Sequence, residues 1–400
     1  MGANLAGPGD LSSRRNPYGP DDSDPRSDEE PSGNTCVAVS GALNFIVTSG
    51  REAVAVSSEE RDPRTALVSD DIDIAIERIN SDFYRQRPHS YLLHRVQALT
   101  MICGRPDVVS ETLAAGVELA GISMTYPNWS PEPEAHLDYL TLEAEVLLFQ
   151  TAEALLRLVL AHAPTDGSSP ALNQAALKSH TEFYRRLEQH IRDASDDALD
   201  HIVINTIHGT DSIGPLQLQP IDGDDVGVAP SQTGLEEGRD NLRGLLRYLA
   251  DYVLSDSCRD VYNSAKHGLA TRTGNLGFRL GGGDGQRPIT DQSGQALTCI
   301  AVGRRNEHGE LPVDNVVVWS NPAEALGVIY MSLHVMDAVW QLGKLRHTRE
   351  EPDEGFCFRT FEGYSVDTIR QAAYNLGPSR GEGFAFATIP HFRLPTGVVL

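Results

Sequence analysis

Arg259, Asn263, Lys266 and His267 bring four different polar groups together in one short segment of the chain. Residues three and four apart share a face of a helix, so these four would line one face if the segment is helical. That face would carry a guanidinium, an amide, an ammonium and an imidazole, and an imidazole can change its charge near neutral pH. The spacing therefore predicts a cationic, hydrogen-bonding face.

Such a face has the groups needed to cleave a phosphodiester bond without a metal ion. His267 would accept the proton of a ribose 2′-hydroxyl, while Lys266 and Arg259 would stabilise the charge that builds on the phosphoryl oxygens. Asn263 would orient the imidazole or the substrate. A purely structural interpretation stays open, in which the two cations pair with nearby aspartates and the other two side chains cap or bridge helix ends.

Other motifs offer less chemistry. The run Gly281–Gly285 lacks the Gly-Lys-Ser/Thr ending of a phosphate-binding loop, so a turn is the favoured interpretation. No histidines have metal-ligand spacing, although His334 and Asp337 are three residues apart and could meet on a helix. The five cysteines are widely spaced with no Cys-x-x-Cys, which favours reduced thiols. We expect no metal and no cofactor.

Apolar residues at helical spacing predict that helices position the cationic segment. The strongest pattern runs from about Glu134 to His162. Before it, helices are predicted around Ile72–Phe83, around Leu92–Cys103 and from Pro106 onward. After it, one helix is predicted from Asn173 to Ala194, a second from a cap at Asp196 to a stop at Gly209, and a third from about Leu235 to Leu254, leading into the cationic segment. The last two are predicted from Pro322 to Leu345 and near Val366–Tyr374.

Short apolar runs separated by turn residues predict a few strands. Leu297–Val302 and Val316–Trp319 flank a turn-rich stretch, which predicts a β-hairpin at about 295–320. Further short strands are predicted within 35–57, at 356–358 and at 384–386. The fold class is therefore predicted as mainly α, an antiparallel helical bundle with a β-hairpin insertion.

Composition divides the chain into four parts. Residues 1–34 are rich in Pro, Gly, Ser and acidic side chains, which predicts a disordered acidic tail. A small N-terminal region of short helices and strands is expected over 35–125, a helical domain over 135–347, and a mixed C-terminal extension over 348–400.

The net charge of −23 argues against non-specific binding to nucleic acid or to an anionic membrane. A local exception lies between Arg239 and Arg279, where seven Arg or Lys against four Asp give a net charge of +3. The first 35 residues contain no apolar run typical of a signal peptide. The most apolar stretch, Val146–Ala161, contains charged residues that are costly in a bilayer. We expect a cytoplasmic protein without a membrane segment.

The chain resembles the HEPN superfamily of helical nucleotide-binding domains over about residues 135–347. The resemblance depends on Phe149–Leu156 with its Gln150 and Glu153, on Phe183–Leu187, on Val203–Gly209, and on Tyr262–Gly268, which is similar to an Asn-x-x-Lys-His-Gly element of uncharacterised bacterial groups. A hairpin followed by a final helix also fits these groups.

The resemblance implies an RNA-targeting protein of bacterial stress or phage defence, with His267, Lys266, Asn263 and Arg259 as its site. Many members are metal-independent endoribonucleases that act as homodimers beside an antitoxin or another defence partner. Their motif separates an Arg from a His by four to six residues, whereas seven separate Arg259 from His267. Other members are non-catalytic scaffolds or protein-interaction modules, which is the alternative expectation.

Overall fold

The structure, a computed structural model, describes residues 63–85, 87, 89–119, 122–124, 133–164, 168–208, 232–267, 271–280, 290–302, 311–348, 361, 363–374 and 384–392. All of them belong to one compact unit, residues 61–400. Within this described part the fold is mainly helical, with eleven α-helices and two antiparallel sheets. The predicted class, mainly α with a β-hairpin, is confirmed at this level. The strands predicted within 35–57 and at 356–358, and the glycine run at 281–285, lie outside the described residues.

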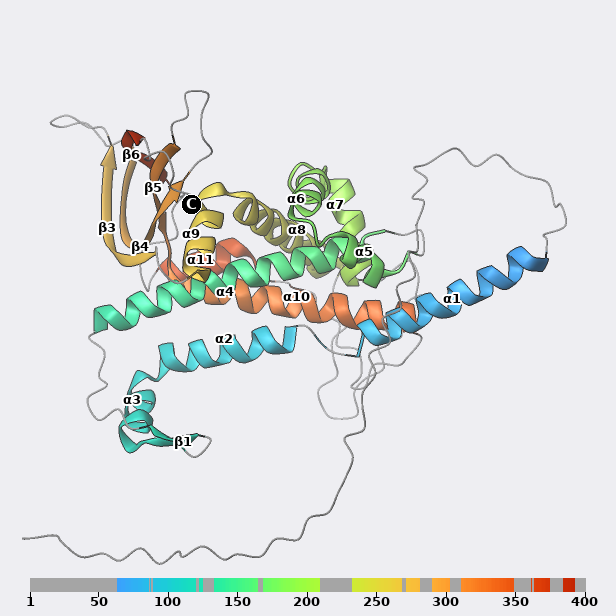
Figure 1. The fold of residues 1–400 in the computed structure, drawn as a ribbon, viewed down its shortest axis with the longest axis horizontal. Helices are drawn as coiled ribbons and strands as arrows, with labels where there is room; N and C mark the ends of the chain where they lie inside the picture. Colours follow the sequence, from blue (N-terminus) through green and yellow to red (C-terminus); the bar gives the residue numbers. More distant parts are fainter. Residues whose placement is uncertain are drawn as a thin grey trace, which may run out of the picture. The chain divides into compact units, whose positions relative to one another are not determined.

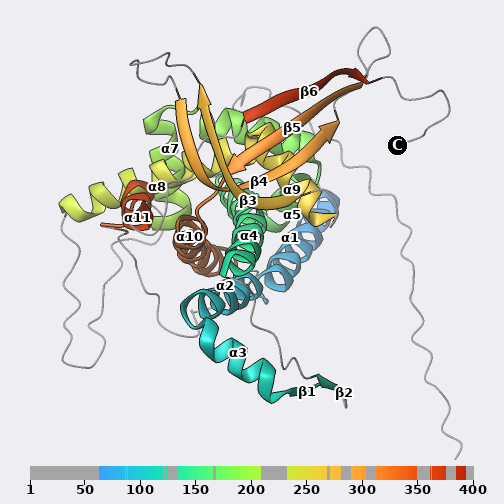
Figure 2. The same ribbon diagram turned by 90° about the vertical axis from the view of Figure 1, so that its left-hand side faces the viewer.

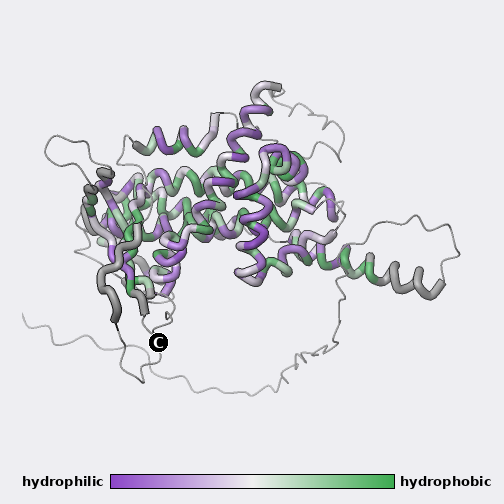
Figure 3. Tube along the Cα trace, turned by 90° about the horizontal axis from the view of Figure 1, so that it is seen from above, coloured by the Kyte–Doolittle hydropathy of each residue, from purple (hydrophilic) through white to green (hydrophobic). Residues whose placement is uncertain are grey.

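Two long helices, α4 (Pro133–His162) and α10 (Pro322–Thr348), lie side by side in the core, as Figure 1 and Figure 2 both show. Both contact α2 (His89–Gly104), and α4 also contacts α8 (Gln232–Leu254). Apolar and polar stretches alternate along the described chain (Figure 3), and the buried residues of α4 and α10 lie on several faces, as expected of helices in the core. The central pair therefore organises the whole described unit.

By length and composition α10 could cross a membrane, yet 61% of its apolar window is buried inside the protein. Val328, Ile329, Val335 and Val339 are fully buried in the main hydrophobic core together with α4 and α8. The role of a core helix therefore accounts for its apolar composition.

Local sequence signals explain where most helices begin. Proline occupies the first position of α1 (Pro63–Phe83), α3 (Pro106–Ala115), α4, α5 (Pro170–Ala176) and α10. Proline is favoured there because the first backbone N–H has no helical partner and the ring already fixes a helical φ. The predicted helix starts at 106, 134 and 322 are correct to within one residue for this reason.

The single helix predicted from Asn173 to Ala194 is wrong. The chain forms α5, then α6 (His180–Leu187), and ends in a short π-helical turn at Glu188–Arg192. The break lies at Leu177, whose carbonyl accepts a hydrogen bond from the Arg157 guanidinium. A tertiary contact from α4 thus ends the helix where the apolar pattern alone would continue it.

The helix expected to be capped by Asp196 is α7 (Asp196–Val203), followed by a π-helical turn at Ile204–His208. Its cap is Ser195 rather than Asp196, because the Ser195 hydroxyl accepts a hydrogen bond from the backbone N–H of Ala198 at 3.3 Å. Asp196 instead occupies the first turn, where a negative charge favours the helix dipole.

A four-stranded antiparallel sheet has the order β3 (Arg272–Leu280), β4 (Thr290–Val302), β5 (Leu311–Trp319) and β6 (Phe384–Phe392). The predicted hairpin is confirmed as β4–β5, in which Cys299 lies opposite Val316. The strand predicted at 384–386 is confirmed as part of β6. A second, two-stranded sheet joins β1 (Val117–Leu119) to β2 (Ile122–Met124), two strands that were not predicted from the sequence.

The predicted boundary between residues 125 and 135 does not separate two cores. Leu92, Val96 and Leu99 of α2 belong to the same buried cluster as α4, α8 and α10. The predicted extension beyond residue 348 is also part of this fold, because α11 (Val366–Tyr374) contacts α10 and α8 and because β6 pairs with β5. The described residues therefore share one helical core with a sheet at one end.

Candidate functional site

The cationic segment forms its own helix, α9 (Asp256–Lys266), instead of continuing α8. Ser255 separates the two helices and caps α9, since its hydroxyl accepts a hydrogen bond from the backbone N–H of Cys258 at 3.4 Å. His267 is the C-terminal cap residue, and its backbone N–H donates to the carbonyl of Asn263 at 3.2 Å. Two local signals thus fix both ends of the helix that carries the candidate site.

One face of α9 is held against the sheet and α4. Val261 is 2% exposed and packs with Leu297, Cys299 and the rest of a small cluster on β4 and β5. Tyr262 stacks on Phe149 of α4, with ring centroids 4.2 Å apart and planes 11° apart. The buried face therefore fixes which way the opposite face points.

The opposite face carries the predicted residues. Asn263, Lys266 and His267 are all exposed, whereas Arg259 is half-buried. At 3.6 residues per turn, the four side chains fall within an arc of about 100°, with Val261 on the other side of the helix. The Lys266 ammonium lies 5.9 Å from the centroid of the Tyr262 ring, which belongs to the same helix. The structure thus brings an amide, an ammonium and an imidazole together at the end of α9.

Arg259 lies apart from this group. Its guanidinium forms an ion pair with Asp256 and sits 5.5 Å above the ring of Tyr184 on α6. At a rise of 1.5 Å per residue, Arg259 is about 12 Å from His267 along the helix axis. A single phosphate at the end of the helix would therefore meet Lys266 and His267 before Arg259.

Three other arginines, Arg243, Arg247 and Arg272, could take this role beside His267, but the first two are engaged elsewhere. Arg243 pairs with Asp200 at 3.0 Å, and Arg247 pairs with Asp196 at 2.7 Å, so both tie α8 to α7. Arg272 opens β3 and is exposed. Of these three arginines, Arg272 is the nearest in sequence to His267.

Burial shifts the pKa values of two titratable groups on the side of α9 that faces the sheet. Burial raises the pKa of the Asp260 carboxyl, while the neighbouring Arg259 guanidinium acts in the opposite direction. Burial also raises the pKa of the Cys299 thiol, against a hydrogen bond from Ser264. Cys299 is also buried on the sheet, so it is not accessible as a nucleophile.

The other polar pair considered from the sequence does not form as expected. Asp337 accepts a hydrogen bond from Gln341 at 2.7 Å and lies 3.1 Å from the imidazole of buried His89, so its partners are these and not His334. The pair joins α2 to α10. Among the residues that the structure describes, no three or more His, Cys, Asp or Glu side chains converge into a metal site.

Comparisons of the chain with protein-family models, with curated proteins and with solved structures found no match. The chemistry of the site must therefore be argued from its own geometry. An exposed imidazole beside an exposed ammonium can exchange a proton and hold an anionic oxygen. Tyr184 is the contact that sequence reasoning missed, because it is remote in sequence from Arg259 and no local pattern links the two.

Proposed function

We propose that this protein targets RNA through α9, as an HEPN-like protein of bacterial stress or phage defence. Its reaction would be metal-independent cleavage of the phosphodiester bond. His267 would take the proton from the 2′-oxygen, which attacks phosphorus as the P–O5′ bond breaks and the 5′-oxygen takes up a proton. The products would be a 2′,3′-cyclic phosphate and a 5′-hydroxyl.

One observation carries the proposal: Asn263, Lys266 and His267 share an exposed face at the end of a helix whose other face is buried. The Val261 cluster and the Tyr262–Phe149 stack hold the backbone, so the three polar groups are positioned without being used in packing. Lys266 would hold the phosphoryl oxygens, and Asn263, one turn before His267, would orient the ribose or the imidazole. In the HEPN-like proposal two copies would bring their α9 faces together, and an antitoxin or defence protein would restrain them.

A second candidate function is supported by Arg259. This side chain is already occupied by Asp256 and Tyr184, and its distance along α9 keeps it from sharing a phosphate with His267. A positive charge in the last turn, such as that of Lys266, also stabilises a helix without any ligand. These features favour a non-catalytic scaffold or protein-interaction module that keeps the helix but not the reaction.

The two candidates are separated by an RNA cleavage assay with EDTA present. The full chain is incubated with an end-labelled RNA and with the same sequence made of deoxynucleotides. We expect only the RNA to be cut, with a 2′,3′-cyclic phosphate end, and His267→Ala to slow cleavage by about 100-fold or more. RNA binding should be retained in that variant, because Lys266 remains.

The matched control is His201→Ala, which removes an exposed histidine from α7. It should cut RNA at the wild-type rate. RNA that is bound but left intact by every variant would support the scaffold. Equal cleavage by the wild type and His267→Ala would exclude His267 as the base, and no binding of RNA at all would overturn both the cleavage and the RNA-targeting proposal.

A further inference from the structure

A second surface, remote in sequence from α9, combines cationic and aromatic side chains. Two cavities of about 510 Å³ and 610 Å³ adjoin there, because Phe83 and Gln174 line both of them. They lie where the end of α1 and the start of α2 meet α5 and α10. Each volume falls in the range of about 300–1,000 Å³ that is typical of small-molecule sites.

The lining is positively charged within a chain that is strongly negative. Four cations line the two cavities against one carboxylate, Asp82. Asp82 pairs with Arg85 at 3.2 Å, and Arg157 is held by Glu153 at 2.6 Å. The other two cations, Arg87 and Lys178, are exposed and form no ion pair with any residue that the structure describes. The charge of Arg87 acts on the Asp337 carboxyl and helps to lower its pKa, so Lys178 is the cation most available to an anion.

Three aromatic side chains line the 610 Å³ cavity. Phe83 and Trp340 are in contact, with ring centroids 5.0 Å apart, and Tyr91 is 64% exposed. Arg95 lies 5.9 Å from the Tyr91 ring, so a cation already rests near one side of it. A flat, weakly polar ligand could stack on such rings, since base–aromatic stacking contributes about 1–3 kcal/mol.

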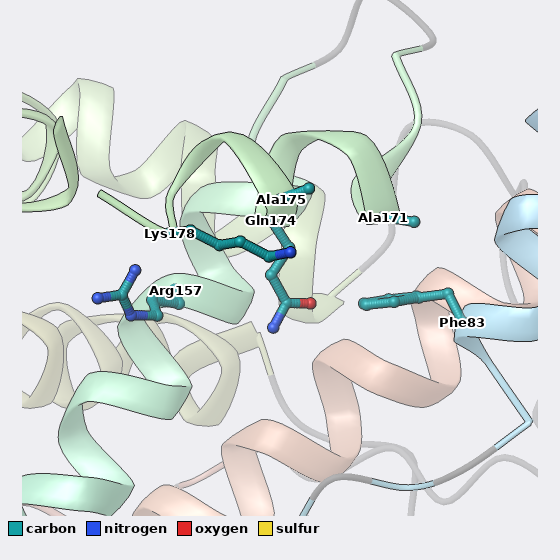
Figure 4. Close-up of a pocket in the computed structure, with 6 residues that line it drawn as sticks. All are labelled: Phe83, Arg157, Ala171, Gln174, Ala175 and Lys178. Carbon is teal, nitrogen blue, oxygen red and sulfur yellow. The ribbon is translucent and has the colours of Figure 1, made fainter. Parts of the chain in front are cut away.

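Between the cations and the rings lies an amide with no partner. The Oε1 atom of Gln174 is buried and accepts no hydrogen bond from any described residue. Figure 4 shows the Gln174 amide and the Phe83 ring directed into the same space, with the Lys178 ammonium beside it and the Arg157 guanidinium directed away from it. Leaving a buried acceptor unsatisfied costs about 1–3 kcal/mol, which a donor on a ligand would recover.

From this combination we propose that the two cavities form a nucleotide site. The base stacks on Tyr91 and Phe83 in the 610 Å³ cavity, where Arg87 adds positive charge, and the phosphate binds Lys178. Gln174 accepts a hydrogen bond from the ribose or from an amino group of the base. The ligand is a free nucleotide or the 5′-phosphorylated end of an RNA strand, which present the same chemistry. The site does not depend on α9 or on cleavage by it.

Calorimetric titration of the full chain with AMP, adenosine and inorganic phosphate tests the proposal. AMP should bind at least tenfold more tightly than either fragment, because only AMP engages both the rings and the cations. Lys178→Glu and Arg87→Glu should each weaken AMP binding at least tenfold. Arg105→Glu is the matched control, since it also replaces an exposed cation by a carboxylate, just beyond the end of α2 that is remote from Tyr91, and should leave AMP affinity unchanged.

Gln174→Leu separates binding from folding. This substitution removes an unpaired buried acceptor, so thermal stability should be unchanged or higher while AMP affinity falls at least tenfold. A short 5′-phosphorylated RNA that displaces AMP identifies a strand end as the source, and one that does not identifies the free nucleotide. AMP binding no tighter than phosphate, or equal losses from Lys178→Glu and Arg105→Glu, would overturn the site.

Discussion

Gly343 offers the sharpest test of how the core positions these surfaces. It lies on α10 against a buried pair in which the Tyr84 hydroxyl donates to His162 Nε2 at 2.6 Å. His162 Nδ1 donates to the carbonyl of Leu158 at 2.8 Å, which leaves Nε2 as the acceptor. A Cβ on residue 343 would overlap the Tyr84 hydroxyl and would lie 2.7 Å from His162 Cδ2. Gly343→Ala should therefore force the pair apart.

The expected loss can be worked out from three contributions. Strain from an extra methyl group in a packed core costs about 1–3 kcal/mol. Loss of the Tyr84–His162 hydrogen bond costs about 1 kcal/mol. Replacing a mid-helix glycine by alanine stabilises the helix by about 1 kcal/mol. Gly343→Ala should thus lower the free energy of unfolding by about 2 kcal/mol, measured by urea denaturation followed by circular dichroism.

Gly244 provides the control on α8. It is also within a helix, but nothing lies within 4 Å of the position that its Cβ would occupy. Gly244→Ala should stabilise the protein by about 0.5–1 kcal/mol, because only the helix-propensity contribution remains. If Gly343→Ala were as stable as Gly244→Ala, the close approach of Tyr84 and His162 to α10 would be wrong.

Two further predictions concern pH and capping. Burial lowers the pKa of His162 to about 4, against about 6.5 when unfolded, so the unfolded chain binds the proton first as pH falls. Neutral His162 contributes stability on the order of 3 kcal/mol, which is complete above pH 6.5 and is lost towards pH 4. The urea midpoint should therefore fall between pH 7.5 and pH 4.5, and it should fall less in His162→Gln than in the wild type. Ser255→Ala should cost about 1 kcal/mol and reduce hydrogen-exchange protection in α9, whereas Ser195→Ala should do so in α7.

Local signals predicted much of the fold. The helix at Val366–Tyr374 and the end of α4 at His162 are found as predicted, since their apolar spacing and flanking residues suffice. The break at Leu177 escaped prediction because its cause, the Arg157 guanidinium, comes from another helix. The spacing of apolar residues also does not show whether an apolar stripe is covered by another element. Ile72 belongs to the apolar stripe of α1, yet it is 52% exposed.

The α9 face could likewise be predicted from local sequence, whereas the two cavities could not. Helical spacing was enough to place Asn263, Lys266 and His267 on one face, because all three lie on one continuous helix. The cavities escaped prediction because Phe83, Gln174 and the other lining residues come from separate helices.

A continuous set of contacts connects the two surfaces through α6. Arg259 of α9 rests on Tyr184, and Glu153 and Arg259 act on the pKa of Tyr184 in opposite directions. Glu153 also holds Arg157, a residue that lines the 510 Å³ cavity and whose guanidinium lies 4.0 Å above the Phe183 ring. A path of neighbouring residues thus runs from this cavity through Glu153 and Tyr184 to Arg259 of α9. We expect any coupling between nucleotide binding and RNA binding to follow this path.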